Sequence, residues 1–118
     1  MTRIKLLPED ELAIKLKEAK IPHERQVQAI PGRRFAFDFY CSTTGMPTFT
    51  GKSVLVEVQG GVHMKRGGHS TGTGITRDAE KASLAAVHGY RLVVATTEHV
   101  RDGRALMWIK QALGLLTV

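Results

Sequence analysis

Two short β-type runs of apolar residues each carry a single carboxylate at their centre. In the run FAFDFY at 35–40 the acid is Asp38, and in the run SVLVEVQ at 53–59 it is Glu57. An ionised carboxylate is costly to remove from water and is rarely tolerated among apolar neighbours without a partner. Any fold of this chain must therefore place both acids where something offsets their charge.

Length and composition bound the class of protein. With 118 residues, 42% of them hydrophobic and 24% charged, we expect a single domain over residues 1–118. The 17 lysine and arginine residues exceed the 11 acids, and the net charge of +6 favours a polyanionic partner, nucleic acid or an anionic membrane surface, although it also serves solubility. The single cysteine, Cys41, and the lack of a signal-peptide or membrane-spanning pattern predict a cytoplasmic, unanchored protein.

Helical and extended patterns alternate along the chain. Helices are expected over 8–20, 75–89 and 102–113, and strands over 35–40, 53–59 and 90–97. A strand followed by a crossover helix and another strand implies an α/β fold, a mixed sheet with helices packed over it. Two apolar stripes are predicted: Phe35, Phe37 and Phe39 on one face of their strand, and Ile75, Ala79, Ala82 and Ala86 on one face of their helix.

The two acidic strands predict a shared site. On a strand, Glu57 and Gln59 leave the same face roughly 6–7 Å apart, and a hairpin would set Asp38 beside Glu57. Carboxylates at that range repel each other, and a divalent cation bound by their oxygens would neutralise this repulsion. Such a cation activates water and screens the charge that develops on a phosphodiester.

Three segments in combination resemble the PD-(D/E)XK nuclease superfamily, most closely the small phage and bacterial nucleases related to the VRR-NUC group. They are GRRFAFDFY at 32–40, VLVEVQGGVHMKRGGH at 54–69 and TGTGITRDAEKASLAAVHGYRLVVAT at 71–96. The resemblance implies a restriction-endonuclease-like αβββαβ core and a Mg²⁺- or Mn²⁺-dependent endonuclease that hydrolyses DNA, often branched or otherwise structured DNA. It also suggests a bacterial host or a phage-infected cell.

The resemblance assigns roles to individual residues. Asp38 and Glu57 match the metal-binding carboxylates, and Val58 would add its backbone carbonyl. Glu24 matches the acid of the first helical region, although IPHERQ places it just past the expected helix end. Gln59 stands where the superfamily usually has lysine, a cation near the attacking water.

Lys81 could supply the missing positive charge from the second helix. The alternative is a surface ion pair with Asp78, one helical turn away, which would stabilise the helix by only about 0.2–0.5 kcal/mol.

Basic residues near the expected site favour contact with a nucleic-acid backbone. The candidates are Arg33, Arg34, Lys65, Arg66, His69 and Arg77. Six glycines between residues 60 and 74 give the intervening segment freedom for close approach, although a mobile solvated loop is the alternative. Two functions follow as hypotheses. One is a DNA endonuclease, with RNA as a less favoured substrate. The other is a nucleic-acid-binding protein that has lost catalytic activity because Gln59 replaces the usual lysine. A homodimer would suit the cutting of two strands.

Overall fold

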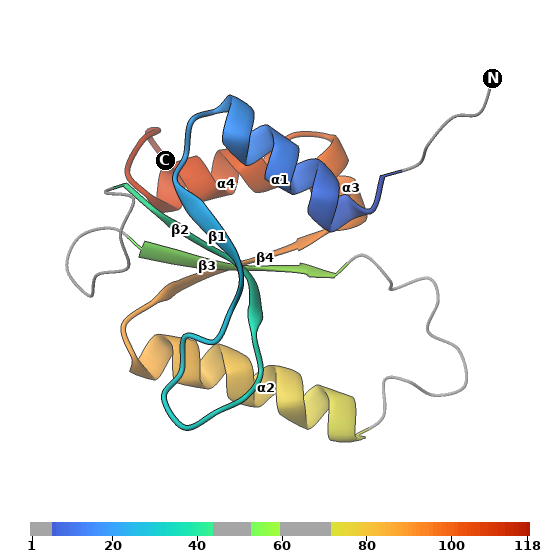
Figure 1. Cartoon of the computed structure of the whole chain (residues 1–118), viewed down its shortest axis with the longest axis vertical. Helices are drawn as coiled ribbons and strands as arrows, with labels where there is room; N and C mark the ends of the chain where they lie inside the picture. Colours follow the sequence, from blue (N-terminus) through green and yellow to red (C-terminus); the bar gives the residue numbers. More distant parts are fainter. Residues whose placement is uncertain (1–5, 44–52, 60–71) are drawn as a thin grey trace.

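The computed structural model describes residues 6–43, 53–59 and 72–118, with backbone alone for residues 72 and 73. Within these ranges the chain runs through α1 (Pro8–Glu18), β1 (His23–Val27), β2 (Phe37–Ser42), β3 (Ser53–Gln59), α2 (Gly72–Val87), β4 (Arg91–Thr96), α3 (Thr97–Arg101) and α4 (Arg104–Ala112). Figure 1 shows these elements as layers, with the strands between α2 on one side and the other three helices on the opposite side.

The strands form one mixed sheet in the order β1-β2-β3-β4. The first two pairings are antiparallel and the pairing of β3 with β4 is parallel, so α2 is the crossover helix between them. Helices α1, α3 and α4 cover one face, and α2 covers the other (Figure 1). The expected α/β class, with a mixed sheet flanked by helices, is confirmed.

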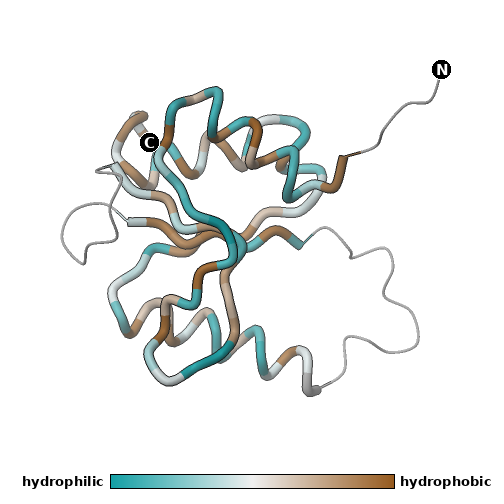
Figure 2. Tube along the Cα trace, viewed as in Figure 1, coloured by the Kyte–Doolittle hydropathy of each residue, from teal (hydrophilic) through white to brown (hydrophobic). Residues whose placement is uncertain are grey.

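Each face of the sheet has its own hydrophobic cluster. On the side of α1 and α4 the buried residues include Leu12, Leu16, Phe39, Val54, Val56, Ala95 and Ile109. On the side of α2 they are Ile30, Phe37, Tyr40, Leu55 and Ala85. The hydrophobic stretches of the central strands accordingly lie between the helix layers (Figure 2).

Helix α1 follows the rules that predicted it. Pro8 lies at its first position, where a missing N–H costs nothing, and three acids fill the first turn near the positive end of the helix dipole. Leu12 and Leu16, four residues apart, are fully buried against the sheet. This anchoring fixes the first turn of α1, with Glu9, at one end of the sheet.

Strand β1 was not predicted, because HERQV has a single apolar residue and its side chains are mostly exposed at the sheet edge. The predicted Phe35, Phe37 and Phe39 stripe is also wrong as a single face. Phe37 and Phe39 are both buried, but they lie in the clusters on opposite sides of the sheet. The alternation breaks at Asp38, opposite Gln26, whose φ of 54° is left-handed.

The buried face of α2 differs from the predicted one. Ile75 is 60% exposed and the alanines at 79, 82 and 86 are exposed too, whereas Ala85 is fully buried and Lys81 and Leu84 are partly buried. The prediction failed because it counted apolar residues, whereas the helix turns a lysine toward the sheet. Lys81 lies over the rings of Phe35 and Phe37, with its nitrogen 5.6 and 4.8 Å from their centroids.

The C-terminal region forms two helices where one was expected. Thr96 caps α3, and its hydroxyl accepts a hydrogen bond from the His99 amide. Gly103 is the N-cap residue of α4, and Asp102 accepts a hydrogen bond from the amide of Arg104, the first residue of that helix. Among the helices of the described ranges, none has the length and apolarity needed to cross a membrane.

One pair of substitutions distinguishes the buried face of α2 from its exposed face. We expect Ala85→Leu to lower the free energy of unfolding by about 1–3 kcal/mol, because the added methylenes enter a filled cluster. Ala86→Leu, on the exposed face, should change it by less than about 0.5 kcal/mol. Urea unfolding followed by circular dichroism measures both, and the reverse order would contradict the assignment of the buried face.

Candidate functional site

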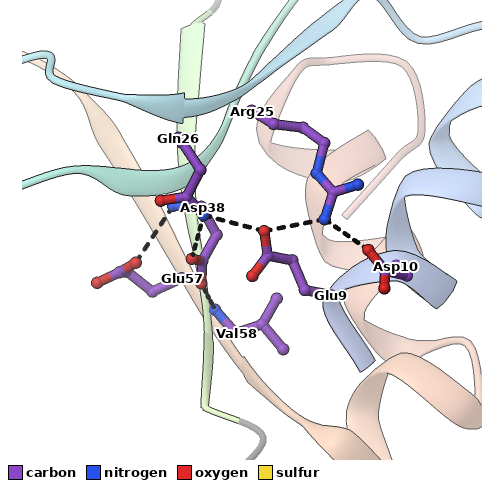
Figure 3. Close-up of polar contacts among 7 residues, drawn as sticks. All are labelled: Glu9, Asp10, Arg25, Gln26, Asp38, Glu57 and Val58. Atoms are coloured by element: carbon purple, nitrogen blue, oxygen red, sulfur yellow. Dashed lines mark hydrogen bonds and ion pairs between the residues drawn. The ribbon is translucent and has the colours of Figure 1, made fainter. Parts of the chain in front are cut away.

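The two strand carboxylates meet where the β2–β3 ladder ends. The last paired residues are Phe39 and Val56. Beyond them the Asp38 amide donates to Glu57 Oε1 at 3.3 Å, and the Val58 amide donates to Asp38 Oδ2 at 2.7 Å. Each carboxylate therefore accepts a hydrogen bond from the backbone of the other's strand (Figure 3). The structure brings Asp38 next to Glu57, as predicted, but at a point where the alternation of side chains along β2 breaks.

Lys81 reaches this pair from α2. Its ammonium donates to Glu57 Oε2 and to the backbone carbonyl of Ala36, the latter at 2.8 Å. The side chains of Lys81 and Glu57 are only 12% and 21% exposed, so the ion pair is poorly screened by water. Asp78, the alternative partner, is exposed on the helix, and the ion pair of Lys81 is made with Glu57 instead.

The charge state of Glu57 is set by opposing influences. Partial burial raises its pKa above the ordinary value of 4.5, and the nearby Asp38 charge raises it further. The hydrogen bond and charge of Lys81 act in the opposite direction without cancelling the effect of burial. The ionised form of Glu57 is thus less favoured than in water, and further positive charge beside it would stabilise that form.

Sequence reasoning missed a third acid, Glu9 in the first turn of α1. The side-chain amide of Gln26 donates to Glu9 Oε2 at 3.0 Å and to Asp38 Oδ1 at 3.2 Å, which links α1 to the carboxylate pair. Arg25 holds the same end of the helix, donating to Glu9 at 3.0 Å and to Asp10 at 2.8 Å (Figure 3). The acidic first turn of the helix was the available signal, but nothing local in the sequence says which strand it would approach.

Glu24 and Gln59 lie at the margins of this cluster. Glu24 lies on β1 rather than on α1, opposite Tyr40, and its side chain is exposed. Because Tyr40 is two residues beyond Asp38 along β2, the structure does not bring Glu24 to the carboxylate pair. Gln59 is the last residue of β3 and is exposed. Glu9, and not Glu24, is the acid from the N-terminal helical region that approaches Asp38.

The structure describes three of the six residues predicted to contact nucleic acid, Arg33, Arg34 and Arg77. Arg33 forms an ion pair with Glu80 at 2.7 Å, next to Lys81 on α2. Arg34 and Arg77 are exposed. Lys65, Arg66 and His69 lie outside the described residues. The three described arginines lie in the segment before β2 and in the first part of α2, the helix that carries Lys81.

The donor atoms of the site fit a hard divalent cation. Asp38 and Glu57 offer carboxylate oxygens, and Asp38 Oδ1 and Glu57 Oε1 are held by long hydrogen bonds of 3.2 and 3.3 Å. An extended residue directs its N–H and C=O to the same edge, so the Val58 carbonyl faces the Asp38 side of β3. Among the described residues no three His, Cys, Asp or Glu side chains form a group that could hold a metal, so a cation at Asp38 and Glu57 would take its further ligands from the backbone or from water.

Comparisons of the chain with protein-family models, with curated proteins and with solved structures found no match. The interpretation of the site therefore rests on its own atoms. They comprise two converging carboxylates, a partly buried ammonium group and an adjacent acid on α1.

The raised pKa of Glu57 predicts a pH dependence of stability. Because the folded state binds this proton more tightly than the unfolded state does, the free energy of unfolding should fall as pH rises from about 4.5 through the folded-state pKa. Glu57→Gln removes the titrating carboxyl group. The unfolding free energy of wild type should therefore fall relative to that of the variant as pH rises from about 4.5 through the folded-state pKa.

Urea unfolding in EDTA at a series of pH values measures this difference. Glu24→Gln, which removes an exposed negative charge from β1, is the control for net charge. A difference between wild type and Glu57→Gln that stays constant or grows in favour of wild type with pH would contradict the assignment.

Proposed function

We propose that this chain is a metal-dependent DNA endonuclease that hydrolyses phosphodiester bonds with Mg²⁺ or Mn²⁺. The observation that carries the proposal is the contact of Asp38 with Glu57 across the end of the β2–β3 ladder, together with the ion pair between Glu57 and Lys81. The order helix, three strands, helix, strand from α1 to β4 supports it, because a restriction-endonuclease-like αβββαβ core has this order. The resemblance of the sequence to the PD-(D/E)XK superfamily points to the same core.

Asp38, Glu57 and the Val58 carbonyl are the groups that would hold the cation. Bound by these groups, a divalent cation would supply a lowered pKa of water and a screening of negative charge on phosphoryl oxygens. The backbone hydrogen bonds between β2 and β3 orient the carboxylates before any ligand arrives, which reduces the reorganisation needed at the site. Glu9 takes the role expected of Glu24, that of an acid next to the pair.

Lys81 supplies the positive charge that Gln59 lacks. Its ammonium lies over the Phe35 and Phe37 rings and donates to the Ala36 carbonyl, so this positive charge is held beside Glu57 rather than free in solvent. An ammonium fixed in this way can stabilise charge on a phosphodiester or orient a water molecule. Gln59 can add a hydrogen bond but no charge.

DNA is the favoured substrate. The net charge of +6, together with exposed Arg33 and Arg34 before β2 and exposed Arg77 on α2, favours a phosphate backbone. Branched or replication and repair DNA follows from the family resemblance. The competing function, a nucleic-acid-binding protein with little or no turnover, is favoured by the exposed glutamine at position 59.

Cleavage assays on branched, duplex and single-stranded DNA test the proposal. We expect wild type to cut at least one substrate with Mg²⁺ or Mn²⁺ and Asp38→Ala to be inactive. Lys81→Met should lower kcat by about 100-fold or more while leaving DNA binding in place, because a fixed charge is lost next to the reacting phosphate.

Lys17→Met removes a lysine from the exposed face of α1 and is the matched control, with kcat unchanged. Circular dichroism of each variant verifies folding. DNA binding by wild type without any cleavage would select the binding protein, and full turnover by Lys81→Met would remove the lysine from the mechanism.

A further inference from the structure

We propose that Gln26 is a positioning residue that holds the Glu9 carboxylate of α1 beside the Asp38 carboxylate of β2. The contact joins an edge strand, a helix and the candidate metal ligand through one side chain. The inference that this sets the affinity for a cation rests on the proposed function. The link between Glu9 and Asp38 stands on the geometry alone.

One nitrogen atom makes both contacts. Gln26 Nε2 lies 3.0 Å from Glu9 Oε2 and 3.2 Å from Asp38 Oδ1, and a primary amide carries two hydrogens, one for each acceptor. The register of β1 with β2 places Gln26 opposite Asp38, between the paired positions Arg25–Phe39 and Val27–Phe37. The amide therefore occupies the space between two acids that would otherwise repel each other.

The backbone of Gln26 departs from a regular strand in the way that this contact requires. Adjacent residues on a strand point to opposite faces, yet Arg25 and Gln26 both donate to Glu9. Gln26 has a φ of 54°, in the left-handed region that glycine and asparagine adopt more readily than glutamine. Backbone preference does not account for a glutamine here, whereas the reach of its amide to both carboxylates does.

A neutral donor suits this position for an electrostatic reason. A lysine or arginine between Glu9 and Asp38 would cancel the negative charge that attracts a cation. An amide orients both carboxylates and leaves their charge in place. Arg25 donates to the same Glu9 oxygen, Oε2, and to Asp10, so the charge of Glu9 is already partly balanced, and Gln26 adds the link to Asp38 without adding positive charge.

The test compares glycine substitutions at two left-handed residues. Gln26→Gly removes the side-chain amide and relieves the left-handed backbone conformation. Lys20→Gly relieves the same conformation at exposed Lys20, whose φ is 60° just past α1, and is the control. Isothermal titration of the metal-free proteins with Mn²⁺ gives the affinity. We expect Gln26→Gly to bind Mn²⁺ about tenfold more weakly than wild type and Lys20→Gly to match wild type.

Equal Mn²⁺ affinity of Gln26→Gly and wild type would overturn the effect on cation binding. Failure of wild type to bind Mn²⁺ would instead count against the proposed function. The link itself is then judged without metal, by a double-mutant cycle of Gln26→Gly with Glu9→Gln in urea unfolding. A coupling of about threefold or more in the unfolding equilibrium constant supports the link, and additive effects overturn it.

Discussion

The reciprocal hydrogen bonding of two carboxylates across the end of the β2–β3 ladder is the constraint on which the candidate site depends. Asp38 and Glu57 each accept an amide hydrogen of the opposite strand, at the point where backbone pairing stops. Amides left without acceptors inside a sheet would be costly, so these acids have a structural use that does not depend on any cation. That use explains how charged residues are tolerated in two otherwise apolar strands.

The two helix layers complete the site from opposite faces of the sheet. Lys81 arrives from α2, and its ammonium offsets part of the charge of Glu57. Glu9 arrives from α1, through Gln26 on the edge strand. The alternation of side chains breaks at Gln26 and Asp38. As a result Phe37 and Phe39 lie in different clusters, and Gln26 reaches Glu9 on α1.

The parts of this arrangement that obey a local period were predictable. The alternation of SVLVEVQ assigned Val54 and Val56 to one face and Glu57 to the other, and the hairpin register placed Asp38 beside Glu57. The face of α2 was not predictable from apolar spacing, because a lysine and not the Ile75 stripe turns toward the sheet. Glu9 and Gln26 depend on a helix docking against an edge strand and on a left-handed glutamine, and neither leaves a periodic pattern in the sequence.

The central claim is that Asp38 and Glu57 share one divalent cation. Diffraction data from crystals grown with Mn²⁺, collected at a wavelength where manganese scatters anomalously, test it most directly. The account predicts an anomalous peak between the two carboxylates, within about 2.0–2.6 Å of an oxygen from each. Carboxylate oxygens that stay on Lys81 and the strand amides, with no peak between them at saturating Mn²⁺, would contradict it.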